Sequence, residues 1–390
     1  MAHPVFANLP TTVFEEMSGL ARELGAINLG QGFPDGPGPL AIRQKAADEV
    51  LNGYNQYPPM AGLPGLREAV AGHYRRSQGL DLDWKTEVTI TSGATEALAA
   101  SFLALVRPGD EVVVFQPVYD AYLPLIRRAG GVPKLVRLEP PHWRFDRAML
   151  EAAFTEKTRF VVLNNPINPA GVVLPREDLE LLAEFVIAHD AVAICDEVWE
   201  QVVFDGARHI PLMSLPNMAE RTVKIGSAGK MFGLTGWKVG FLCAAPDLTH
   251  ALARAHQFLT FTTPPNLQAA VAFGLDDPGD WFTAMPAGLQ RSRDRLAAGL
   301  TAEGFKVLPS QGTYFLNVDL AASGVSEPDR AFALRAVKEA GVAAIPVSAL
   351  YEQDPVTRIL RLCFSKGDAT LDSGVERLAR ARELSRKATG

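Results

Sequence analysis

Apolar and polar positions follow two different patterns along the chain. From about Leu66 to Phe273, short β-rich apolar runs alternate with amphipathic helical stretches, as in a mostly parallel sheet with helices on both faces. Helices are expected at Thr95–Val106 and Arg176–His189. Strands are expected at Val88–Thr91, Val112–Phe115, Lys134–Leu138, Phe160–Leu163, Val192–Cys195, Thr222–Ile225 and Gly240–Ala244. These elements predict one large α/β domain.

The order of elements changes after about Trp281, where a smaller α+β unit is predicted. Its elements are a long helix at Leu289–Glu303, strands at Phe305–Leu308, Tyr314–Asp319, Val342–Pro346 and Ile359–Phe364, a helix near Arg330–Ala340 and a final helix. The first forty residues are rich in turns, so we expect them to pack on this unit. The predicted division is an N-terminal segment at residues 1–42, a large domain at 43–280 and a small domain at 281–390.

Composition narrows the possible partners. The 390 residues are 47% hydrophobic and 21% charged, and the net charge of −6 offers no basic face for nucleic acid. The cysteines Cys195, Cys243 and Cys363 lie far apart in apolar runs, which predicts buried thiols in a reducing compartment. No apolar stretch has the length of a membrane span, so we expect a cytoplasmic protein. The scattered histidines predict no metal site.

The stretch SAGKMFGLTGWKVG at residues 227–240 carries the strongest chemical signal. Lys230 follows small residues and the hydroxyl of Ser227, and precedes glycines and a second base, Lys238. This pattern suits a cofactor that is both an aldehyde and a phosphate ester, which describes pyridoxal 5′-phosphate. A solvated loop lysine is the alternative, so residues elsewhere have to decide.

Two strand ends supply candidate partners for such a cofactor. Asp196 ends a buried apolar run and needs a cation, which a protonated pyridine nitrogen would supply; a helix N-cap or a salt bridge is the alternative. Asn168 follows another strand within a proline-framed segment. Its amide could donate to a phenolate-like oxygen or a substrate carboxylate, or it could belong to an ordinary turn.

Anion-binding features complete the set. Gly93, Ala94 and Thr95 open a helix whose free amides suit a phosphate, with Ser227 and Lys238 beside them. Tyr119 could stack on the cofactor ring or belong to the core. Arg361 lies inside an apolar run, where it could bind a carboxylate in bidentate fashion or extend from an edge strand to solvent.

In chain order these motifs resemble the fold-type I, class I/II aminotransferases, and more closely the branch of the kynurenine, glutamine, methionine and N-succinyldiaminopimelate aminotransferases. The resemblance runs from INLGQGFPD at residues 27–35 to RLCF at residues 361–364. It implies a large domain with a mostly parallel mixed sheet between helices, a smaller α+β domain, and a homodimer with shared active sites. It also implies ping-pong transamination between L-amino acids and 2-oxo acids.

The resemblance assigns a role to each candidate residue. Lys230 would bond to the cofactor aldehyde and act in catalysis with Asp196, at the pyridine nitrogen, and Asn168, at the ring hydroxyl. The other implied cofactor contacts are Gly93, Ala94, Thr95, Tyr119, Trp199, Ser227, Lys238 and Tyr57, the last reaching a phosphate across the dimer interface. The implied substrate contacts are Phe14, Gly32, Asn168, Phe261, Thr262 and Arg361.

One position departs from the family in a way that can be tested. Trp199 stands where most relatives have a tyrosine that donates to the ring hydroxyl, and its indole offers only an N–H. We therefore expect the visible absorption of the bound cofactor to titrate at a shifted pH, and Trp199→Tyr to move it back. An identical titration in both proteins would remove this hypothesis.

Two further positions bear on the substrate. Phe14 and Thr262 fall where the kynurenine-type enzymes have tryptophan and histidine, which argues against kynurenine. Phe261 still matches, so an apolar pocket for a side chain such as that of Met, Phe or Leu is expected, with Gln also a candidate. A β-lyase and an N-succinyldiaminopimelate aminotransferase remain alternatives. A ligand-sensing regulator would need a DNA-binding segment, for which the first thirty residues show no pattern.

Overall fold

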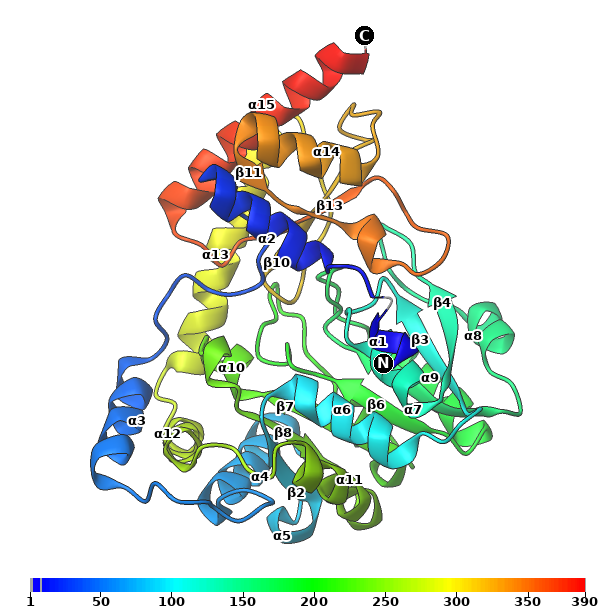
Figure 1. Cartoon of the computed structure of the whole chain (residues 1–390), viewed down its shortest axis with the longest axis vertical. Coiled ribbons are helices and arrows are strands. Elements are labelled where there is room, and N and C mark those ends of the chain that lie inside the picture. Colours follow the sequence, from blue (N-terminus) through cyan, green and yellow to red (C-terminus); the bar gives the residue numbers. More distant parts are fainter. Residues whose placement is uncertain (1–2, 8, 390) are drawn as a thin grey trace.

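The structure is a computed structural model that describes residues 3–7 and 9–389. A seven-stranded sheet forms the centre of its larger part (Figure 1). Its strand order is β2-β8-β7-β6-β5-β3-β4. The strands are β2 (Val88–Thr91), β3 (Glu111–Gln116), β4 (Val132–Arg137), β5 (Thr158–Asn164), β6 (Val192–Asp196), β7 (Thr222–Ser227) and β8 (Gly240–Cys243). Strand β8 is antiparallel to both neighbours and the other pairs are parallel, which confirms the predicted mostly parallel sheet.

Both faces of this sheet are buried, as β5 illustrates. Phe160 and Val162 pack in one core with residues of α6 and α7, whereas Val161 and Leu163 pack in another with α8 and α9. Because successive strand side chains point to opposite faces, a strand covered on both sides has to be apolar throughout. The covering helices are α4 (Pro64–Gln78), α5 (Trp84–Glu87), α6 (Ala94–Leu105), α7 (Tyr122–Ala129), α8 (Arg147–Ala153), α9 (Arg176–Ala188), α11 (Pro246–Leu259) and α12 (Pro265–Asp276).

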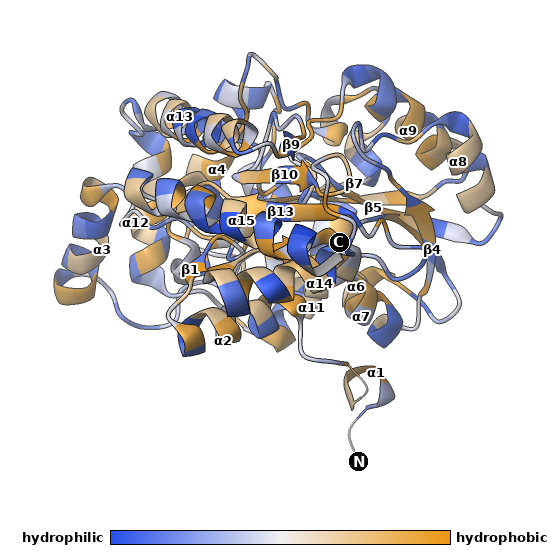
Figure 2. Cartoon of the chain, turned by 90° about the horizontal axis from the view of Figure 1, so that it is seen from above, coloured by the Kyte–Doolittle hydropathy of each residue, from blue (hydrophilic) through white to orange (hydrophobic). Residues whose placement is uncertain are grey.

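A second, antiparallel sheet of order β12-β13-β10-β9 organises the C-terminal unit. Its strands are β9 (Lys306–Val307), β10 (Phe315–Asp319), β12 (Ile345–Pro346) and β13 (Ile359–Cys363), and its helices are α13 (Trp281–Ala302), α14 (Asp329–Arg335) and α15 (Asp368–Thr389). Figure 2 shows β10 and β13 as hydrophobic and α15 as largely hydrophilic. None of the helices in the described ranges has the length and apolar character needed to cross a membrane.

The N-terminal segment contributes α1 (Pro4–Ala7), α2 (Val13–Leu24) and β1 (Ile27–Asn28). Strand β1 pairs in parallel with β11 (Val342–Ala343), and Met17 and Leu29 are buried in the core of the C-terminal unit. The next helix, α3 (Leu40–Asn52), packs instead against α12 of the large unit. The residue boundaries at 42 and 280 stay a prediction.

Two predicted elements were wrong in extent. The helix expected at Leu289–Glu303 begins at Trp281 and continues through Pro286. Its first residue, Trp281, is held in place by its indole, which donates to the Met231 carbonyl at 2.8 Å. The strand expected at Val342–Pro346 is two short strands, because β11 pairs with β1 and β12 pairs with β13. In both cases partners from distant parts of the sequence set the boundaries.

Candidate functional site

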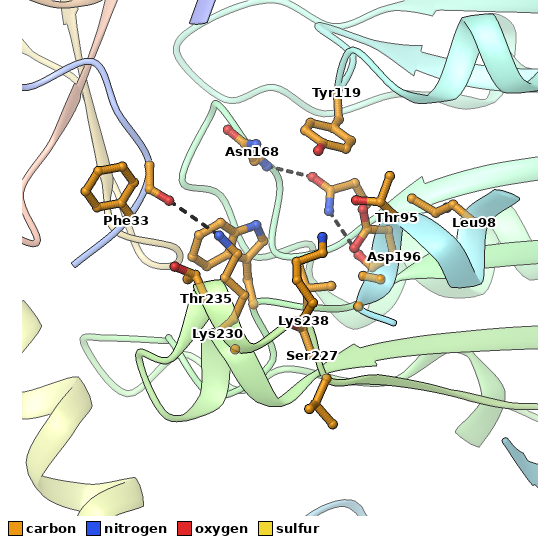
Figure 3. Close-up of a pocket in the computed structure, with 18 of the residues that line it drawn as sticks. Phe33, Thr95, Leu98, Tyr119, Asn168, Asp196, Ser227, Lys230, Thr235 and Lys238 are labelled. Carbon is orange, nitrogen blue, oxygen red and sulfur yellow. Dashed lines mark hydrogen bonds between the residues drawn. The ribbon is translucent and has the colours of Figure 1, made fainter. Parts of the chain in front are cut away.

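A cavity of about 310 Å³ lies at the carboxyl ends of the parallel strands (Figure 3). It is lined by the turn before α6, the segments after β3 and β5, the end of β6, and the segment from β7 through α10 (Ala228–Met231). Lys230 and Lys238 point into it from one side, and Tyr119 and Asn168 face them from the other. Open α/β sheets bind ligands at this edge. The predicted residues that line it are Gly32, Gly93, Ala94, Thr95, Tyr119, Asn168, Asp196, Trp199, Ser227, Lys230 and Lys238.

Asp196 presents an unsatisfied carboxylate oxygen to this cavity. Its Oδ2 accepts a hydrogen bond of 2.5 Å from the Tyr122 hydroxyl, while its Oδ1 is buried and has no hydrogen-bond partner among the described residues. Burial raises the pKa of the Asp196 carboxyl. A buried carboxylate oxygen needs a donor, and a protonated ring nitrogen is one that also neutralises the charge. No salt bridge to Asp196 is present among the described residues, and the contacts with Tyr122 and the Val198 backbone lower its pKa less than burial raises it.

Lys230 lies on α10, and its amine is enclosed by aromatic and backbone groups. Its Nζ donates to the Tyr314 hydroxyl at 3.0 Å and, more weakly, to the Gly32 carbonyl at 3.4 Å. The Nζ also lies 4.6 Å from the centre of the Trp199 ring. Burial lowers the pKa of Lys230 to about 8. The amine is therefore neutral for a large fraction of the time at mildly alkaline pH, the form that attacks aldehydes and accepts protons.

The end of the cavity near α6 combines uncapped helix amides with a lysine, which suits an anion. The helix has Gly93 as its N-cap and no side chain caps it, so its first amides remain available to an anion. Lys238 is close: a Cβ atom on Gly93 would lie 3.1 Å from its Nζ. A Cβ on Gly240 would lie 2.6 Å from the Gly93 carbonyl carbon, so glycine is required there for the turn to sit against β8.

Arg361 does not line the cavity itself but contacts Asn168, which does. It is 1% exposed on β13, which lies between two other strands, so it does not extend to solvent from an edge. Its guanidinium donates to Asn168 Oδ1 at 2.9 Å and to the Gly30 carbonyl at 2.7 Å, and lies 3.8 Å from the Phe315 ring centre. Burial lowers the pKa of Arg361 to about 10, and its Nε has no partner among the described residues.

Four further predicted residues do not line the cavity within one chain. Tyr57 is 79% exposed, its ring contacts Phe261 at 5.5 Å between centroids, and it shares a separate surface depression with Thr262. Phe14 lines another hollow but also contacts the site, because the Arg361 guanidinium lies 5.0 Å from its ring centre.

Sequence reasoning missed two tyrosines in contact with the central groups. Tyr122 holds Asp196, and Tyr314 holds Lys230. Each could have been suspected from a hydroxyl in an otherwise apolar stretch, three residues after Tyr119 in one case and just before the strand at Phe315 in the other. Trp199 packs edge-on against Tyr314 at 4.4 Å between centroids, and its indole makes no hydrogen bond within the described residues.

A buried cluster of charges supports the segment that follows Asp196. Lys224, on β7, binds Glu197 and also Glu200, whose Oε2 is 2.6 Å from its Nζ, and all three side chains are at most 1% exposed. His209 contacts Glu197 at 3.1 Å. Glu197, Glu200 and His209 could form a metal-binding group by geometry, but the Lys224 ammonium already supplies the cation. The cluster thus joins β7 to the segment that contains Asp196 and Trp199. Strand β7 leads directly to Lys230.

Comparisons with known proteins agree with this geometry. Residues 25–378 match the family described as aminotransferase class I and II. The chain is 44% identical over 380 residues to a probable N-succinyldiaminopimelate aminotransferase DapC of Mycobacterium tuberculosis, covering 95% of this chain and 96% of that protein. It is 40% identical to the methionine aminotransferase of Escherichia coli, with coverage of 95% and 96%.

Solved structures give the same result. The N-succinyldiaminopimelate aminotransferase from Mycobacterium tuberculosis superposes with a TM-score of 0.95 at 44% identity, covering 98% of this chain and 100% of that one. The match covers nearly the whole chain, and the unpaired Oδ1 of Asp196, the uncapped start of α6 and the buried amine of Lys230 fit the cofactor of this family. The chain therefore belongs to the class I and II aminotransferases and is an enzyme that depends on pyridoxal phosphate.

Proposed function

We propose that this aminotransferase takes its amino group from an L-amino acid with an uncharged, apolar or aromatic side chain, such as Met, Phe, Leu or Gln. The observation that carries the proposal is the lining of the cavity. Its described basic residues are Lys230 and Lys238, and much of the remainder is apolar or aromatic, including Phe33, Leu98 and Trp199. Both lysines have other roles in the proposed mechanism, so no cation on this lining is left for a charged substrate side chain.

In this mechanism Arg361, aided by the Gly32 backbone and Asn168, binds the substrate α-carboxylate. A guanidinium matches a carboxylate in bidentate fashion, and its burial strengthens the interaction. The two Nη groups already donate to Asn168 Oδ1 and to the Gly30 carbonyl, whereas the Nε has no partner among the described residues. The incoming carboxylate would therefore compete with these two oxygens. This contact fixes the α-carbon relative to Lys230.

Lys230 is proposed to move the proton at the substrate α-carbon. When bound, pyridoxal phosphate supplies the electron sink that stabilises the resulting carbanion. Asp196 would hold the ring nitrogen through its carboxylate, Asn168 would bind the ring oxygen, and Tyr119 would pack on the ring. Ser227, Lys238 and the amides of Gly93, Ala94 and Thr95 would hold the phosphate.

A second candidate donor is an N-succinylated diamino acid. It is favoured by the 44% identity to the DapC protein of Mycobacterium tuberculosis. Such a substrate carries a second carboxylate at the far end, and its recognition would need a cation from outside the described cavity lining.

We further propose a homodimer in which Tyr57, Phe261 and Thr262 complete the site of the partner subunit. Tyr57 and Phe261 are 79% and 40% exposed and their rings are in contact, and large apolar side chains that cluster on a surface indicate an interface. A mass in solution of 42.1 kDa, that of one chain, would contradict the dimer.

Location and domain division complete the proposal. Cys195, Cys243 and Cys363 are free and buried, which supports a reducing compartment, the cytoplasm. Recovery of the protein in a cytoplasmic fraction would test this. We also propose the division into an N-terminal segment at residues 1–42, a large domain at 43–280 and a small domain at 281–390.

The experiment is to add single amino acids to the cofactor-loaded enzyme without a 2-oxo acid and to follow the visible absorption. L-Met, L-Phe and L-Leu are expected to remove the visible band and to yield one equivalent of 2-oxo acid, whereas L-Asp and L-kynurenine should react weakly. A response confined to N-succinyl-L,L-diaminopimelate would replace the first proposal by the second. Pyruvate and ammonia released from a cysteine S-conjugate would identify a β-lyase instead.

A further inference from the structure

The Lys230 amine is held from one side by two oxygens. Tyr314 Oη accepts its hydrogen bond at 3.0 Å, and the Gly32 carbonyl lies at 3.4 Å. Lys230 lines the cavity of about 310 Å³ and also a second cavity of about 480 Å³, whereas Tyr314 lines only the second of these two. The hydroxyl therefore meets the amine on the side of the second cavity.

The hydroxyl of Tyr314 already donates its proton in another hydrogen bond. It is donated to the Gly32 carbonyl at 2.6 Å, so the oxygen lone pairs remain for Lys230. Burial raises the pKa of Tyr314 well above its ordinary value, which keeps it a neutral phenol. Tyr314 can thus act on Lys230 as a hydrogen-bond acceptor but not as an acid or as a counterion.

A neutral amine has two N–H bonds and one lone pair in a tetrahedral arrangement. When its N–H groups point to Tyr314 and Gly32, the lone pair has to point away from both oxygens. We propose that Tyr314 is a positioning residue, whose hydroxyl turns the lone pair of the Lys230 amine toward the cavity and the substrate α-carbon. The inference rests on the catalytic role proposed for Lys230, and it is independent of which amino acid is the donor.

The Tyr314 ring is itself fixed by aromatic neighbours. Trp199 packs edge-on against it, with 4.4 Å between centroids and an interplanar angle of 88°, and Phe315 lies at 5.1 Å. The Lys230 Nζ lies beside this pair of rings, 4.6 Å from the centre of the Trp199 ring and 5.3 Å from the centre of the Tyr314 ring. In this proposal Trp199 also has a positioning role, because it fixes the Tyr314 ring whose hydroxyl orients Lys230.

Tyr314→Phe in the cofactor-loaded enzyme tests the proposal, because it keeps the ring and removes the oxygen. We expect kcat to fall about 10- to 100-fold, a part of the 10²- to 10⁴-fold that a positioned base contributes. The KM of the amino donor should stay close to that of the wild type, since the carboxylate contact at Arg361 is retained.

A second readout does not depend on activity. In the cofactor-free protein, the pH dependence of Lys230 labelling by an amine-reactive reagent, followed by peptide mass spectrometry, reports its pKa. The wild-type pKa is expected near 8. Loss of the Tyr314 oxygen removes an acceptor that favours the ammonium form, so the pKa should fall further in the variant.

Tyr351→Phe is the matched control. Tyr351 is also buried and donates its hydroxyl to a backbone carbonyl, that of Leu138 at 2.7 Å, but it lies outside the site. The control should keep the wild-type kcat and Lys230 pKa while losing a similar hydrogen bond. The proposal is wrong if Tyr314→Phe lowers kcat no more than Tyr351→Phe does and leaves the Lys230 pKa unchanged.

A milder change covers the case in which Tyr314→Phe does not fold. Site-specific 3-fluorotyrosine at position 314 keeps the shape and hydrogen bonds but weakens the oxygen as an acceptor. The pKa of Lys230 should fall in the same direction, and no change would overturn the inference. If Lys230→Ala retains activity, the proposed role of the lysine fails instead, so the two failures can be told apart.

Discussion

Lys230→Ala is expected to lower kcat for any amino donor by at least about 10²- to 10⁴-fold, the range that a positioned acid–base group contributes. The amine is buried, its pKa is lowered to about 8 by that burial, and it faces the cavity beside Asp196 and Trp199. No other amine lines this cavity within the described residues except Lys238, which lies beside Gly93 at the start of α6. Stopped-flow absorbance during a single turnover measures the loss directly.

Lys238→Ala is the matched comparison, because it removes the other lysine of the same cavity. This variant should weaken cofactor binding, while kcat at saturating cofactor falls less than in Lys230→Ala. Reduction with borohydride followed by peptide mapping should find the cofactor attached to the peptide of Lys230 in wild type and in Lys238→Ala. Equal kinetic losses in both variants, or attachment at another lysine, would contradict the assignment.

Lys224→Met is expected to lower the free energy of unfolding by about 3–5 kcal/mol, the typical loss when one partner of a buried ion pair is removed. Lys224 is fully buried and contacts Glu197 and Glu200, which would be left without their cation. Burial alone would raise the pKa of Glu197, but Lys224 and His209 hold it down to about 2. Chemical denaturation of the cofactor-free protein measures the change.

The pH dependence of stability should weaken at this cluster. In the wild type the depressed pKa of Glu197 contributes stability above the ordinary glutamate pKa, and this is lost as the pH falls toward 2. Lys224→Met removes the largest cause of the depression and leaves His209, so the pKa of Glu197 should rise and the variant should lose less stability than the wild type as the pH falls. Adding Glu197→Gln and Glu200→Gln to Lys224→Met should recover part of the loss.

Lys134→Met provides the control for this comparison. Lys134 also bridges to a glutamate, Glu111 at 3.7 Å, but its side chain is 34% exposed. An exposed pair of this kind contributes about 0–1 kcal/mol, so this variant should change stability by less than about 1 kcal/mol. A loss in Lys224→Met no larger than in Lys134→Met would show that the buried cluster contributes little.

The local sequence was enough for the strands of the large sheet and for most residues of the cavity. Strands buried on both faces must be apolar throughout, so the runs that became β5 and β6 stand out without any knowledge of their neighbours. Asp196 was found because a carboxylate ends a buried apolar run at the edge of the sheet where ligands bind. Lys230 was found from the small residues, glycines and second lysine around it, and Arg361 from a charge inside an apolar run.

Only the tertiary structure decided the features that depend on contacts between distant segments. The partition of residues 342–346 into β11 and β12 follows from their different partner strands, and the start of α13 follows from the contact of Trp281 with Met231. Tyr122 and Tyr314 became part of the site because packing brings their hydroxyls to Asp196 and Lys230. A hydroxyl in an apolar stretch has many possible partners, and the sequence does not encode which one folding brings within hydrogen-bond distance.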